Sequence, residues 1–391
     1  MKSMRDLALG GQRLFLRVDF NVPLNGGTVS DATRIRETIP TVRLASEAGA
    51  RVVCASHLGK PKGKPNPKYS LAPVAVAFAR DLARPVRFVE DCVGREVLRV
   101  VGELADGDVL VLENLRFHPG EESNDPEFAR QLAAWADAYV DDAFGAAHRA
   151  HASVVGVPLL VKEKAAGLLM EREVRELSQL LHPERPFAAI LGGAKIADKI
   201  ETLRALAKTA DLLLVGGGMA NHFVKALGLP IGRSLLDPES VPLAREILDF
   251  CKAAKKTIAL PSDFVVARSP EDGSGARTVG ITQIPPDLMA LDVGPKTLEQ
   301  FARLLSPART VFWNGPMGVF EHPPFDRSTR ALAMLLADSD AVTVVGGGES
   351  VAAVHAAGVA DRFSHVSTGG GASLEFIANG TLPGIEALSD K

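Results

Sequence analysis

The stretch DAVTVVGGGES (residues 340–350) places a short apolar run directly before three glycines, a carboxylate and a hydroxyl. The run from Ala341 to Val345 has the length and valine content of a strand that is buried on both faces. Glycines after such a strand permit either a tight turn into a helix or a close approach of backbone to phosphate. A carboxylate has the wrong charge to meet phosphate directly, so the role of Glu349 needs an explanation.

Similar apolar runs alternate with helical patterns along nearly the whole chain. They are RLFLRVDF (13–20), ARVVCASH (50–57), DVLVLEN (108–114), AYVDDAF (138–144), FAAILGG (187–193), DLLLVGGG (211–218), KTIALPSD (256–263), RTVFWNG (309–315) and DAVTVVGGG (340–348). Near-continuous Val, Ile and Leu predict parallel strands covered by helices on both faces, which is an α/β fold. The runs end in polar residues or glycine, at the edge of the sheet where ligands bind in such folds.

A candidate domain boundary lies in KEKAAGLLMEREVRELSQLLHPERP, residues 162–186. Five of its apolar residues fall near helical spacing: Leu168, Leu169, Val174, Leu177 and Leu181. Pro183 and Pro186 then end the helix. About four strands precede this segment and about five follow it, so we expect two α/β domains joined by a long helix.

Composition excludes several classes of protein. The 391 residues are 46% hydrophobic and 23% charged, and the net charge of -3 gives no general attraction to nucleic acid or to anionic membranes. Cys54, Cys92 and Cys251 are widely spaced and form no metal-binding pattern, which is typical of a reducing compartment. The N-terminus lacks an apolar signal core and no run approaches 18 apolar residues, so we expect a cytoplasmic protein.

The strongest short motifs for nucleotide and hydrolytic chemistry are absent. The sequence has no GxxxxGK[ST], GxGxxG, HExxH, paired CxxC or GxSxG. Its second half instead carries five glycine clusters, each after an expected strand: LGGAKIADK (191–199), LVGGGMAN (214–221), WNGPMGVFE (313–321), VVGGGES (344–350) and STGGGASLE (367–375). Each could simply be a tight turn. Together they predict one floor of N–H groups and helix N-termini that binds an anion.

Two lysines follow the first of these clusters. Lys195 and Lys199 would lie on one face near the start of a helix, where cations oppose the helix dipole. They are either solvated lysines or partners of an anionic ligand.

The first half of the chain supplies cationic side chains where strands stop. These are Arg34 and Arg36 in DATRIRETIP (31–40), His57 and Lys60 in SHLGK (56–60), Arg116 in ENLRFHPGEE (113–122), and His148, Arg149 and His151 in DAFGAAHRAHAS (142–153). Asp19 and Asn21 end another strand in RVDFNVP (17–23). One such residue would be an ordinary surface charge. Several at one edge of a sheet predict a site for a small polyanion such as a phosphorylated acid.

Two cationic or glycine-lined half-sites on separate domains suggest two anionic ligands that meet when the domains close. Phosphoryl transfer fits this arrangement because its catalysis is mostly positioning and neutralisation of charge. A two-domain dehydrogenase is the alternative from another class, and the missing GxGxxG argues against it.

The ordered motifs resemble those of the phosphoglycerate kinase family over nearly the whole chain. The matching segments are RVDFNVP, SHLGKPKG, ENLRFHPGEE, DAFGAAHRAHAS, ILGGAKIADKI, VGGGMAN, LDVGPKT, WNGPMGVFE and STGGGASLE. The resemblance implies a monomeric cytoplasmic enzyme of glycolysis. It would transfer a phosphoryl group between 1,3-bisphosphoglycerate and MgADP, giving 3-phosphoglycerate and MgATP.

The resemblance also implies a domain plan of two Rossmann-like domains with parallel sheets, joined by a long helix and a hinge. Residues 1–166, with a returning tail at 377–391, would bind 3-phosphoglycerate. Residues 167–182 would form the interdomain helix, and residues 183–376 would bind the nucleotide.

The family's site residues carry over to matching positions of this sequence. The triose acid is expected on Asp19, Phe20, Asn21, Arg34, His57, Leu58, Gly59, Lys60, Arg116 and Arg149. The nucleotide is expected on Gly192, Gly193, Lys199, Gly216, Gly217, Phe264, Ala290, Leu291, Asn314, Pro316, Glu321, Gly347, Gly348, Glu349 and Ser350. Glu321 would take the ribose hydroxyls. The residues expected to act on the transferring group are Arg34, Lys195, Gly347 and Gly370, with Gly348 and Gly371 completing its cradle.

Three positions depart from the family's usual pattern. Lys60 stands where the family has Arg, Ala290 where it has Gly, and Glu349 where it has Asp. The ammonium group of Lys60 is a point charge, whereas the guanidinium of Arg presents several donors in one plane. The methyl group of Ala290 would crowd the base of the nucleotide. Glu349 is expected to face the Mg²⁺ that travels with the nucleotide, with Ser350 capping the next helix or touching phosphate. As alternatives, Glu349 only favours the helix dipole, or the chain is a catalytically impaired relative that binds anions.

Overall fold

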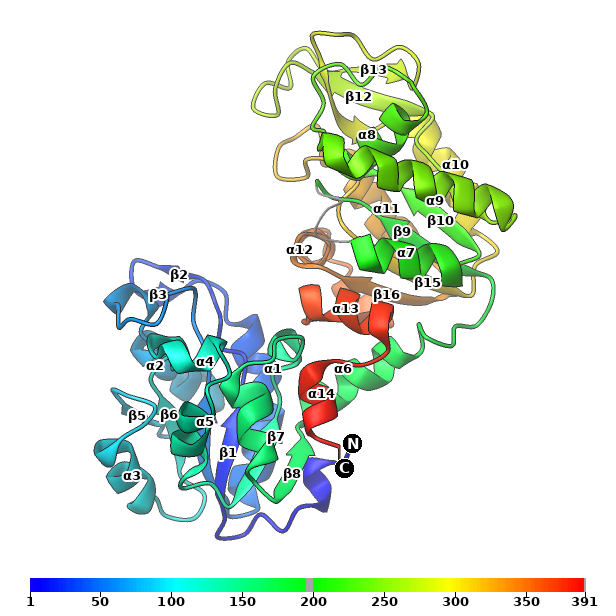
Figure 1. The fold of residues 1–391 in the computed structure, drawn as a ribbon. Helices are drawn as coiled ribbons and strands as arrows, with labels where there is room; N and C mark the ends of the chain where they lie inside the picture. The colour runs from blue at the N-terminus through cyan, green and yellow to red at the C-terminus, as the bar shows by residue number, and fades with distance from the viewer. Residues whose placement is uncertain (195–199, 390–391) are drawn as a thin grey trace. The chain divides into compact units, whose positions relative to one another are not determined.

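The computed structural model describes residues 1–194 and 200–389, and the chain divides into two compact units. Unit 1 comprises Met1–Arg175 and Thr381–Lys391, and unit 2 comprises Glu176–Gly380. Helix α6 (Leu168–Ser178) leads from one to the other (Figure 1). It is shorter than the helix expected at 167–182, because the next turn is closed by tighter bonds, from Leu180 N–H to Leu177 O and from Leu181 N–H to Ser178 O.

Unit 1 is built on a parallel sheet of six strands in the order β5-β6-β4-β1-β7-β8. The strands are β1 (Arg13–Arg17), β4 (Arg51–Ala55), β5 (Arg87–Val89), β6 (Val109–Leu112), β7 (Ala138–Asp141) and β8 (Glu163–Ala166). A small hairpin, β2 (Leu24–Asn25) and β3 (Thr28–Val29), follows β1. The sequence suggested about four strands here, because β5 and β8 are too short or too polar to stand out as apolar runs.

Helices cover both faces of this sheet. They are α1 (Thr33–Glu47), α2 (Ala72–Leu82), α3 (Arg95–Gly102), α4 (Pro119–Glu122), α5 (Pro126–Ala133) and α14 (Pro383–Ala387). Short 3₁₀ turns are η1 (Met4–Asp6), η2 (Pro67–Tyr69), η3 (Leu115–Phe117), η4 (Phe144–Ala146) and η6 (Val157–Leu159), and η5 (Ala152–Gly156) is a π turn.

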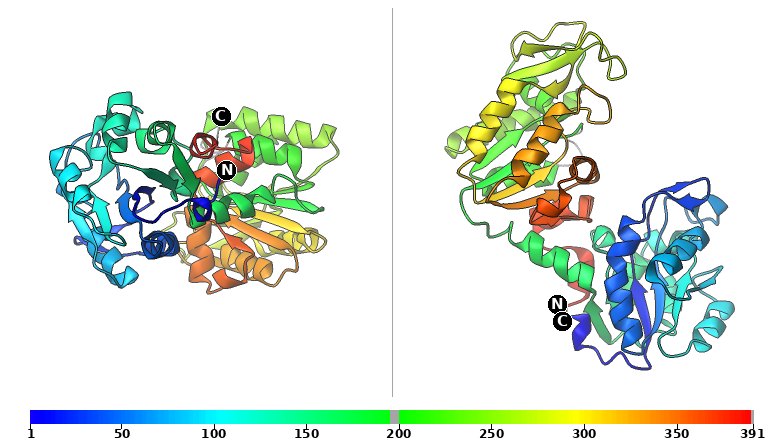
Figure 2. Two further views of the ribbon diagram at one scale, coloured as in Figure 1. Left: turned by 90° about the horizontal axis from the view of Figure 1, so that it is seen from below. Right: turned by 180° about the vertical axis from the view of Figure 1, so that it is seen from behind.

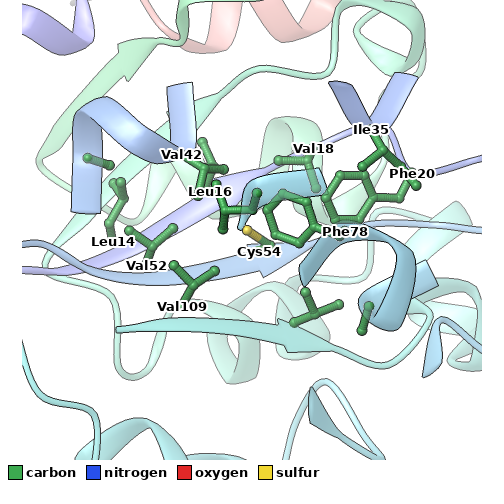
Figure 3. Close-up of a cluster of buried hydrophobic side chains, with 14 of the residues drawn as sticks. Leu14, Leu16, Val18, Phe20, Ile35, Val42, Val52, Cys54, Phe78 and Val109 are labelled. Atoms are coloured by element: carbon green, nitrogen blue, oxygen red, sulfur yellow. The ribbon is translucent and has the colours of Figure 1, made fainter. Parts of the chain in front are cut away.

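The alternation of side chains along β1 shows why both faces are buried. Leu14 and Leu16 point to the core under α1 and α2, together with Val52 and Cys54 of β4 (Figure 3). Phe15 points the other way and stacks with aromatic rings on that face. Every one of these side chains is fully buried, as expected for a parallel strand covered on both sides.

Unit 2 repeats this plan with a second parallel sheet of six strands in the order β11-β10-β9-β15-β16-β17. The strands are β9 (Phe187–Leu191), β10 (Leu212–Val215), β11 (Thr257–Ala259), β15 (Thr310–Asn314), β16 (Val342–Gly346) and β17 (His365–Val366). The helices are α7 (Ile200–Thr209), α8 (Gly217–Ala226), α9 (Val241–Ala253), α10 (Pro295–Leu305), α11 (Arg327–Ala337), α12 (Gly348–Ala356) and α13 (Gly371–Asn379), with 3₁₀ turns η8 (Pro238–Ser240) and η9 (Ala360–Arg362). Helices α10 and α11 cover one face and α7 and α9 the other (Figures 1 and 2).

An antiparallel sheet that the sequence did not predict also belongs to unit 2. It has the order β13-β12-β14, with β12 (Asp263–Ala267), β13 (Arg277–Gly280) and β14 (Met289–Val293). It carries the expected nucleotide contacts Phe264, Ala290 and Leu291. Its strands are short and interrupted by polar residues, so they give little apolar periodicity to detect.

The C-terminal segment packs on unit 1, where the Gly384 N–H donates to the Ala147 carbonyl at 2.8 Å. The chain joins unit 1 at Thr381, a few residues after the position 377 expected for the returning tail. In the part of the chain that the structure describes, no helix has the length and apolar character needed to span a membrane.

Candidate functional site

A cationic cluster forms in unit 1 at the carboxyl ends of β6, β4, β1 and β7, four adjacent strands of its sheet. Because these strands are parallel and adjacent, the loops that follow them meet at one edge. The cluster consists of Asp19, Asn21, His57, Gly59, Arg116 and Arg149 from these loops and Arg34 from the first turn of α1.

Arg34 is held in place by a carboxylate. Its Nη1 atom lies 2.8 Å from Asp19 Oδ2 and donates to the Asn21 carbonyl at 3.3 Å. Asp19 is 6% exposed, whereas 36% of the Arg34 side chain is open to solvent. Among the described residues, the other N–H groups of Arg34 have no partner, so they are available to an anion.

Gly59 links three of the expected site residues. Its N–H donates to Asn21 Oδ1 at 2.9 Å, and its carbonyl accepts from Arg116 Nη1 at 2.8 Å. Its φ is +61°, and a Cβ atom would lie 2.4 Å from the ring of Tyr69. Only glycine fits this position, which ties the loop after β4 to Asn21 on one side and Arg116 on the other.

His57 is a neutral hydrogen-bond donor in this cluster. It is 3% exposed, and its Nδ1 atom lies 3.1 Å from Arg17 Nη2. A guanidinium can only donate, so Nδ1 accepts and Nε2 carries the proton. Burial, reinforced by the charges of Arg17 and Arg116, holds the pKa of His57 well below its usual value.

The cluster holds more positive charge than its carboxylates offset. Burial and the neighbouring Arg149 lower the pKa of Arg116 to about 10. Arg116 Nε lies 3.3 Å from Glu122 Oε1 but makes no hydrogen bond with it, so this buried N–H is unsatisfied. Burial and adjacent arginines also lower the pKa values of His148 to about 4 and of His151 to about 3. A bound anion would relieve this excess.

A buried network that the sequence interpretation missed positions His57. Arg17 Nε donates to Ser153 Oγ at 2.9 Å, and Ser153 Oγ donates to Glu121 Oε1 at 2.6 Å. Arg17 and Glu121 are both fully buried. The available signal was an arginine inside the apolar run RLFLRVDF, since a charge within a buried strand must be paired.

Asn114 was also missed as a positioning residue. Its Nδ2 donates to the Leu58 carbonyl at 2.7 Å, and its Oδ1 accepts from the N–H groups of Leu58 and Arg116. It therefore fixes the loop after β4 against the loop after β6.

Three expected substrate contacts differ in their exposure to solvent. Phe20 is fully buried with its ring 4.9 Å from Phe78, and Leu58 is 4% exposed in the same core. The backbone N–H groups of both residues are also hydrogen-bonded within the unit, so neither residue has a free donor or a free side chain to offer a ligand. Lys60 is exposed directly after Gly59, so its ammonium group is free to meet solvent or a ligand.

A second cluster forms in unit 2 at the carboxyl ends of β9, β15, β16 and β17. It borders a pocket of about 450 Å³. The lining residues are Ala194, Asn314, Gly315, Gly347, Gly348, Glu349, Ser350, Gly370, Gly371 and Leu374. The structure thus brings together the glycine clusters of residues 313–321, 344–350 and 367–375.

The glycines nearest β9 and β10 serve packing. The N–H groups of Gly192 and Gly193 donate to the carbonyls of Asn314 and Pro316, each at 2.8 Å, and those of Gly216 and Gly217 donate to Leu191 and Met317. A Cβ atom on Gly192 would lie 2.2 Å from the Pro316 carbonyl oxygen. The expectation of free N–H groups is therefore wrong for Gly192, Gly193, Gly216 and Gly217, because neighbouring backbone already accepts from them.

The glycines at the N-termini of α12 and α13 have backbone N–H groups that are free to bind a ligand. Among the described residues, no hydrogen bond is made by the N–H groups of Gly347, Gly348, Gly370 and Gly371. A Cβ atom on any of the last three would meet nothing within 4 Å. Neither helix has a side-chain cap at its N-terminus. Two helix N-termini with free N–H groups at one pocket make a site for phosphate.

Oxygen ligands stand beside these N–H groups. Glu349 is exposed in the first turn of α12, and Asn314 Oδ1 is buried without a hydrogen-bond partner while its Nδ2 donates to Gly346. A carboxylate and an amide oxygen are ligands that fit Mg²⁺. The Gly315 N–H donates to Ser350 Oγ at 2.5 Å. The expectation that Ser350 caps the next helix is wrong, because Ser350 lies inside α12 and Gly347 occupies the cap position.

The remaining expected nucleotide contacts lie on or beside the antiparallel sheet. Phe264 is 1% exposed and Leu291 is 5% exposed, so little of either side chain is free. The half-buried Ala290 donates its N–H to Ser234 Oγ at 2.8 Å, and Glu321 is exposed. Lys195 and Lys199 lie outside the described residues.

Comparisons with known proteins identify the family of this chain. The sequence model of the family described as Phosphoglycerate kinase matches residues 4–380. A phosphoglycerate kinase of Anaeromyxobacter dehalogenans (strain 2CP-C) is 51% identical over 100% of both chains. The solved phosphoglycerate kinase of Coxiella burnetii is 39% identical, with a TM-score of 0.88 over 99% of this chain and 98% of that chain. The enzyme of Pyrococcus horikoshii OT3 has a TM-score of 0.88 over the same shares at 33% identity. The chain therefore belongs to the phosphoglycerate kinase family.

Proposed function

We propose that the two clusters serve the reversible glycolytic reaction of this family. A phosphoryl group moves between the acyl phosphate of 1,3-bisphosphoglycerate and MgADP, giving 3-phosphoglycerate and MgATP. The observation that carries the proposal is that both clusters are built for anions. One holds unbalanced positive charge around the buried Arg116, and the other points two uncapped helix N-termini at a pocket.

Unit 1 binds the triose acid. Arg34, Arg116, Arg149 and Lys60 take its phosphate and carboxylate oxygens, and His57 donates from Nε2. Asp19 and Asn21 fix the arginine and the loop that surround the ligand. Of the 3-phosphoglycerate domain expected at residues 1–166 with a tail at 377–391, unit 1 contains residues 1–166 and the tail from Thr381 onward.

Unit 2 binds the nucleotide in residues 183–376. Gly347, Gly348, Gly370 and Gly371 receive its phosphates through backbone N–H groups. Gly192, Gly193, Gly216, Gly217 and Pro316 shape the floor behind them, as their mutual backbone bonds suggest. Phe264, Ala290 and Leu291 border the base, Glu321 takes the ribose hydroxyls, and Lys199 meets a phosphate.

The chemistry needs no general base. The acceptor carboxylate of 3-phosphoglycerate is already ionised, and its oxygen attacks the γ-phosphorus in line as the bond to the β-bridging oxygen breaks. The low pKa values of His57, His148 and His151 fit this mechanism, because the three rings stay neutral and none serves as a general acid. Arg34 neutralises charge on the transferring group, and Lys195 follows it. Catalysis is thus mainly positioning and neutralisation as the two domains close about the interdomain helix.

Glu349 and Asn314 would hold the Mg²⁺ that accompanies the nucleotide. When bound, the ion neutralises phosphate charge. The extra methylene of Glu349, relative to the family's Asp, changes its reach to an ion that demands near-ideal octahedral geometry. The enzyme works as a cytoplasmic monomer, and its net charge of -3 gives no pull to nucleic acid or membrane.

A crystal structure with MgADP and 3-phosphoglycerate tests these assignments. We expect the acid at Arg34 and Arg116, and the nucleotide phosphates at Gly348 and Gly371. Either ligand in a different place would contradict the assignment. Calorimetry that shows both ligands binding to a protein without phosphoryl transfer would favour the impaired relative instead, an alternative suggested by the departures at Lys60, Ala290 and Glu349.

A further inference from the structure

Three different metal-ligand types meet in unit 1 outside the cationic cluster. Asp91 and Cys92 follow the edge strand β5, and His118 follows the 3₁₀ turn η3. One ligand atom from each residue lies within 4.8 Å of the others. His118 Nε2 is 2.7 Å from Asp91 Oδ1. The phosphoryl-transfer reaction uses none of these three side chains.

The two segments are fixed by independent contacts. The Asp91 carbonyl accepts from the Glu113 N–H at 3.3 Å, and Asp91 Oδ1 accepts from the Cys92 N–H at 2.7 Å. The imidazole of His118 stacks on Phe128 with ring centres 5.1 Å apart. The donor atoms are therefore held together by backbone and packing rather than by their own mutual attraction alone.

A pocket lined by carboxylates beside these three residues could accommodate a cation. A pocket of about 470 Å³ is bordered by Asp91 and His118 together with Glu90 and Glu113. Asp91 and His118 are partly exposed, whereas Cys92 is 1% exposed. Burial first, and then the nearby carboxylates, raise the pKa of the Cys92 thiol well above its usual value. This thiol is therefore not a reactive nucleophile, and the same carboxylates attract positive charge.

We propose that Asp91, Cys92 and His118 form a binding site for a borderline-soft divalent cation of the Zn²⁺ type. Sulfur, nitrogen and oxygen donors together suit Zn²⁺, whereas Mg²⁺ and Ca²⁺ take oxygen donors alone. Zn–N and Zn–S bonds of ~2.0–2.3 Å require the donors to draw closer, and the exposed side chain of Asp91 has room to rotate toward the other two. Binding releases the thiol proton of Cys92 to solvent and replaces the hydrogen bond between His118 and Asp91. The pocket supplies water as the fourth ligand.

A bound ion would join the end of β5 to the segment that follows η3. The middle residue of η3 is Arg116, a member of the cationic cluster. The bound ion would thus stabilise the loop that carries Arg116.

Titration with Co²⁺ as a spectroscopic probe for Zn²⁺ tests the site on the full chain without nucleotide. The wild-type protein is expected to develop thiolate-to-cobalt charge-transfer absorption that Zn²⁺ abolishes and excess Mg²⁺ leaves in place. Cys92→Ser should lose this absorption, and His118→Gln should bind Co²⁺ roughly 10-fold or more weakly. Cys251→Ser is the matched control, because Cys251 is an equally buried free cysteine in unit 2. It should retain the wild-type spectrum.

Absence of thiolate absorption in the wild-type protein, or its persistence in Cys92→Ser, would overturn the proposal. Circular dichroism confirms that each variant is folded. If Cys92→Ser does not fold, His118→Gln and Asp91→Asn decide the matter, since both residues are partly exposed. Unchanged Co²⁺ affinity in both would equally overturn it.

Discussion

The Nδ1 atom of His57 lies 3.1 Å from Nη2 of Arg17 inside unit 1. Because arginine only donates, this contact fixes the tautomer and leaves the proton of His57 on Nε2, where it can donate. Arg17 is itself held through Ser153 to the buried Glu121. A network of fully buried residues thus keeps a histidine neutral in a site for a polyanion.

His57 in the cationic cluster and His148 and His151 beside its arginines are expected to stay neutral through the physiological range. The pKa values of His148 and His151 are lowered to about 4 and about 3, and burial and arginine charges hold the pKa of His57 well below its usual value. Ring resonances of these three residues, followed by NMR and assigned through single His→Asn variants, should not titrate between about pH 6 and 8, the range that brackets the unperturbed value near 6.5. A midpoint close to that of free histidine for any of them would contradict this assignment of neutral rings.

Arg34→Ala is expected to lower kcat by ~10²–10³-fold while the affinity for MgADP stays unchanged. The arginine is anchored to Asp19 in unit 1, and the nucleotide pocket belongs to unit 2. Steady-state kinetics and calorimetry with MgADP measure the two effects. Arg36→Ala is the matched control, because Arg36 lies in the same helix but pairs with Asp81 at the surface. A large loss of MgADP affinity in Arg34→Ala would refute this role.

Two glycine substitutions should separate packing from ligand binding. Gly192→Ala places a Cβ atom 2.2 Å from the Pro316 carbonyl and is expected to lower the free energy of unfolding by ~1–3 kcal/mol. Gly348→Ala meets nothing within 4 Å, so the fold should keep its stability while affinity for the nucleotide phosphates falls. Chemical denaturation and calorimetry with MgADP provide the measurements. Unchanged nucleotide affinity in a folded Gly348→Ala protein would exclude Gly348 from the phosphate cradle.

Substitutions of Glu349 should alter the Mg²⁺ dependence of turnover. Glu349→Asp restores the family's usual residue and changes the carboxylate's reach, and Glu349→Ala removes a hard oxygen ligand. We expect the Mg²⁺ concentration for half-maximal rate to rise ~10-fold or more in Glu349→Ala and to shift in Glu349→Asp. The affinity for 3-phosphoglycerate, bound in the other unit, serves as the internal control. If neither variant shifts the Mg²⁺ dependence, Glu349 acts only on the dipole of α12.

Asp142 caps the helix that joins the two units. Its Oδ1 accepts from the N–H groups of Leu169 at 2.8 Å and Met170 at 3.2 Å, and a Cβ atom on Gly167 would lie 2.2 Å from the same oxygen. Asp142→Ala is expected to lower the free energy of unfolding by ~1 kcal/mol, whereas Asp142→Asn keeps an acceptor and loses less.

The same residue predicts a pH dependence of stability. Burial raises the pKa of Asp142 from 3.8 to about 7 in the folded protein. Between these values the folded state holds more protons than the unfolded state, so this contribution to stability is lost as the pH rises from about 4 to about 7. Denaturation across this range should show a smaller loss of stability with rising pH in Asp142→Asn than in wild type. An identical slope would contradict the raised pKa.

Most strands of the parallel sheets could be predicted from the sequence, because they are nearly continuous apolar runs, whereas the short or polar edge strands β5 and β8 could not. Which glycines keep a free backbone N–H group could not be predicted. VVGGGES and LVGGGMAN look alike as sequences, yet among the described residues the N–H groups of Gly347 and Gly348 make no hydrogen bond, while those of Gly216 and Gly217 donate to neighbouring backbone. Which N–H groups are free depends on which strand lies beside each loop, and that is a tertiary property.

The positioning residues were missed for a related reason. Arg17, Glu121 and Ser153 each lie in one of the motifs that the sequence offered, but the three are far apart in sequence and no local spacing links them. Their roles arise from burial at one end of the sheet, where each polar group must find a partner. Sequence patterns identified the residues of the cationic cluster but not those that hold them in place.

The proposed reaction can be followed directly as formation of ATP from 1,3-bisphosphoglycerate and MgADP in a coupled assay. We expect sustained turnover that depends on both substrates and on Mg²⁺. Folded protein that binds MgADP and 3-phosphoglycerate but forms no ATP above background would contradict the proposed function.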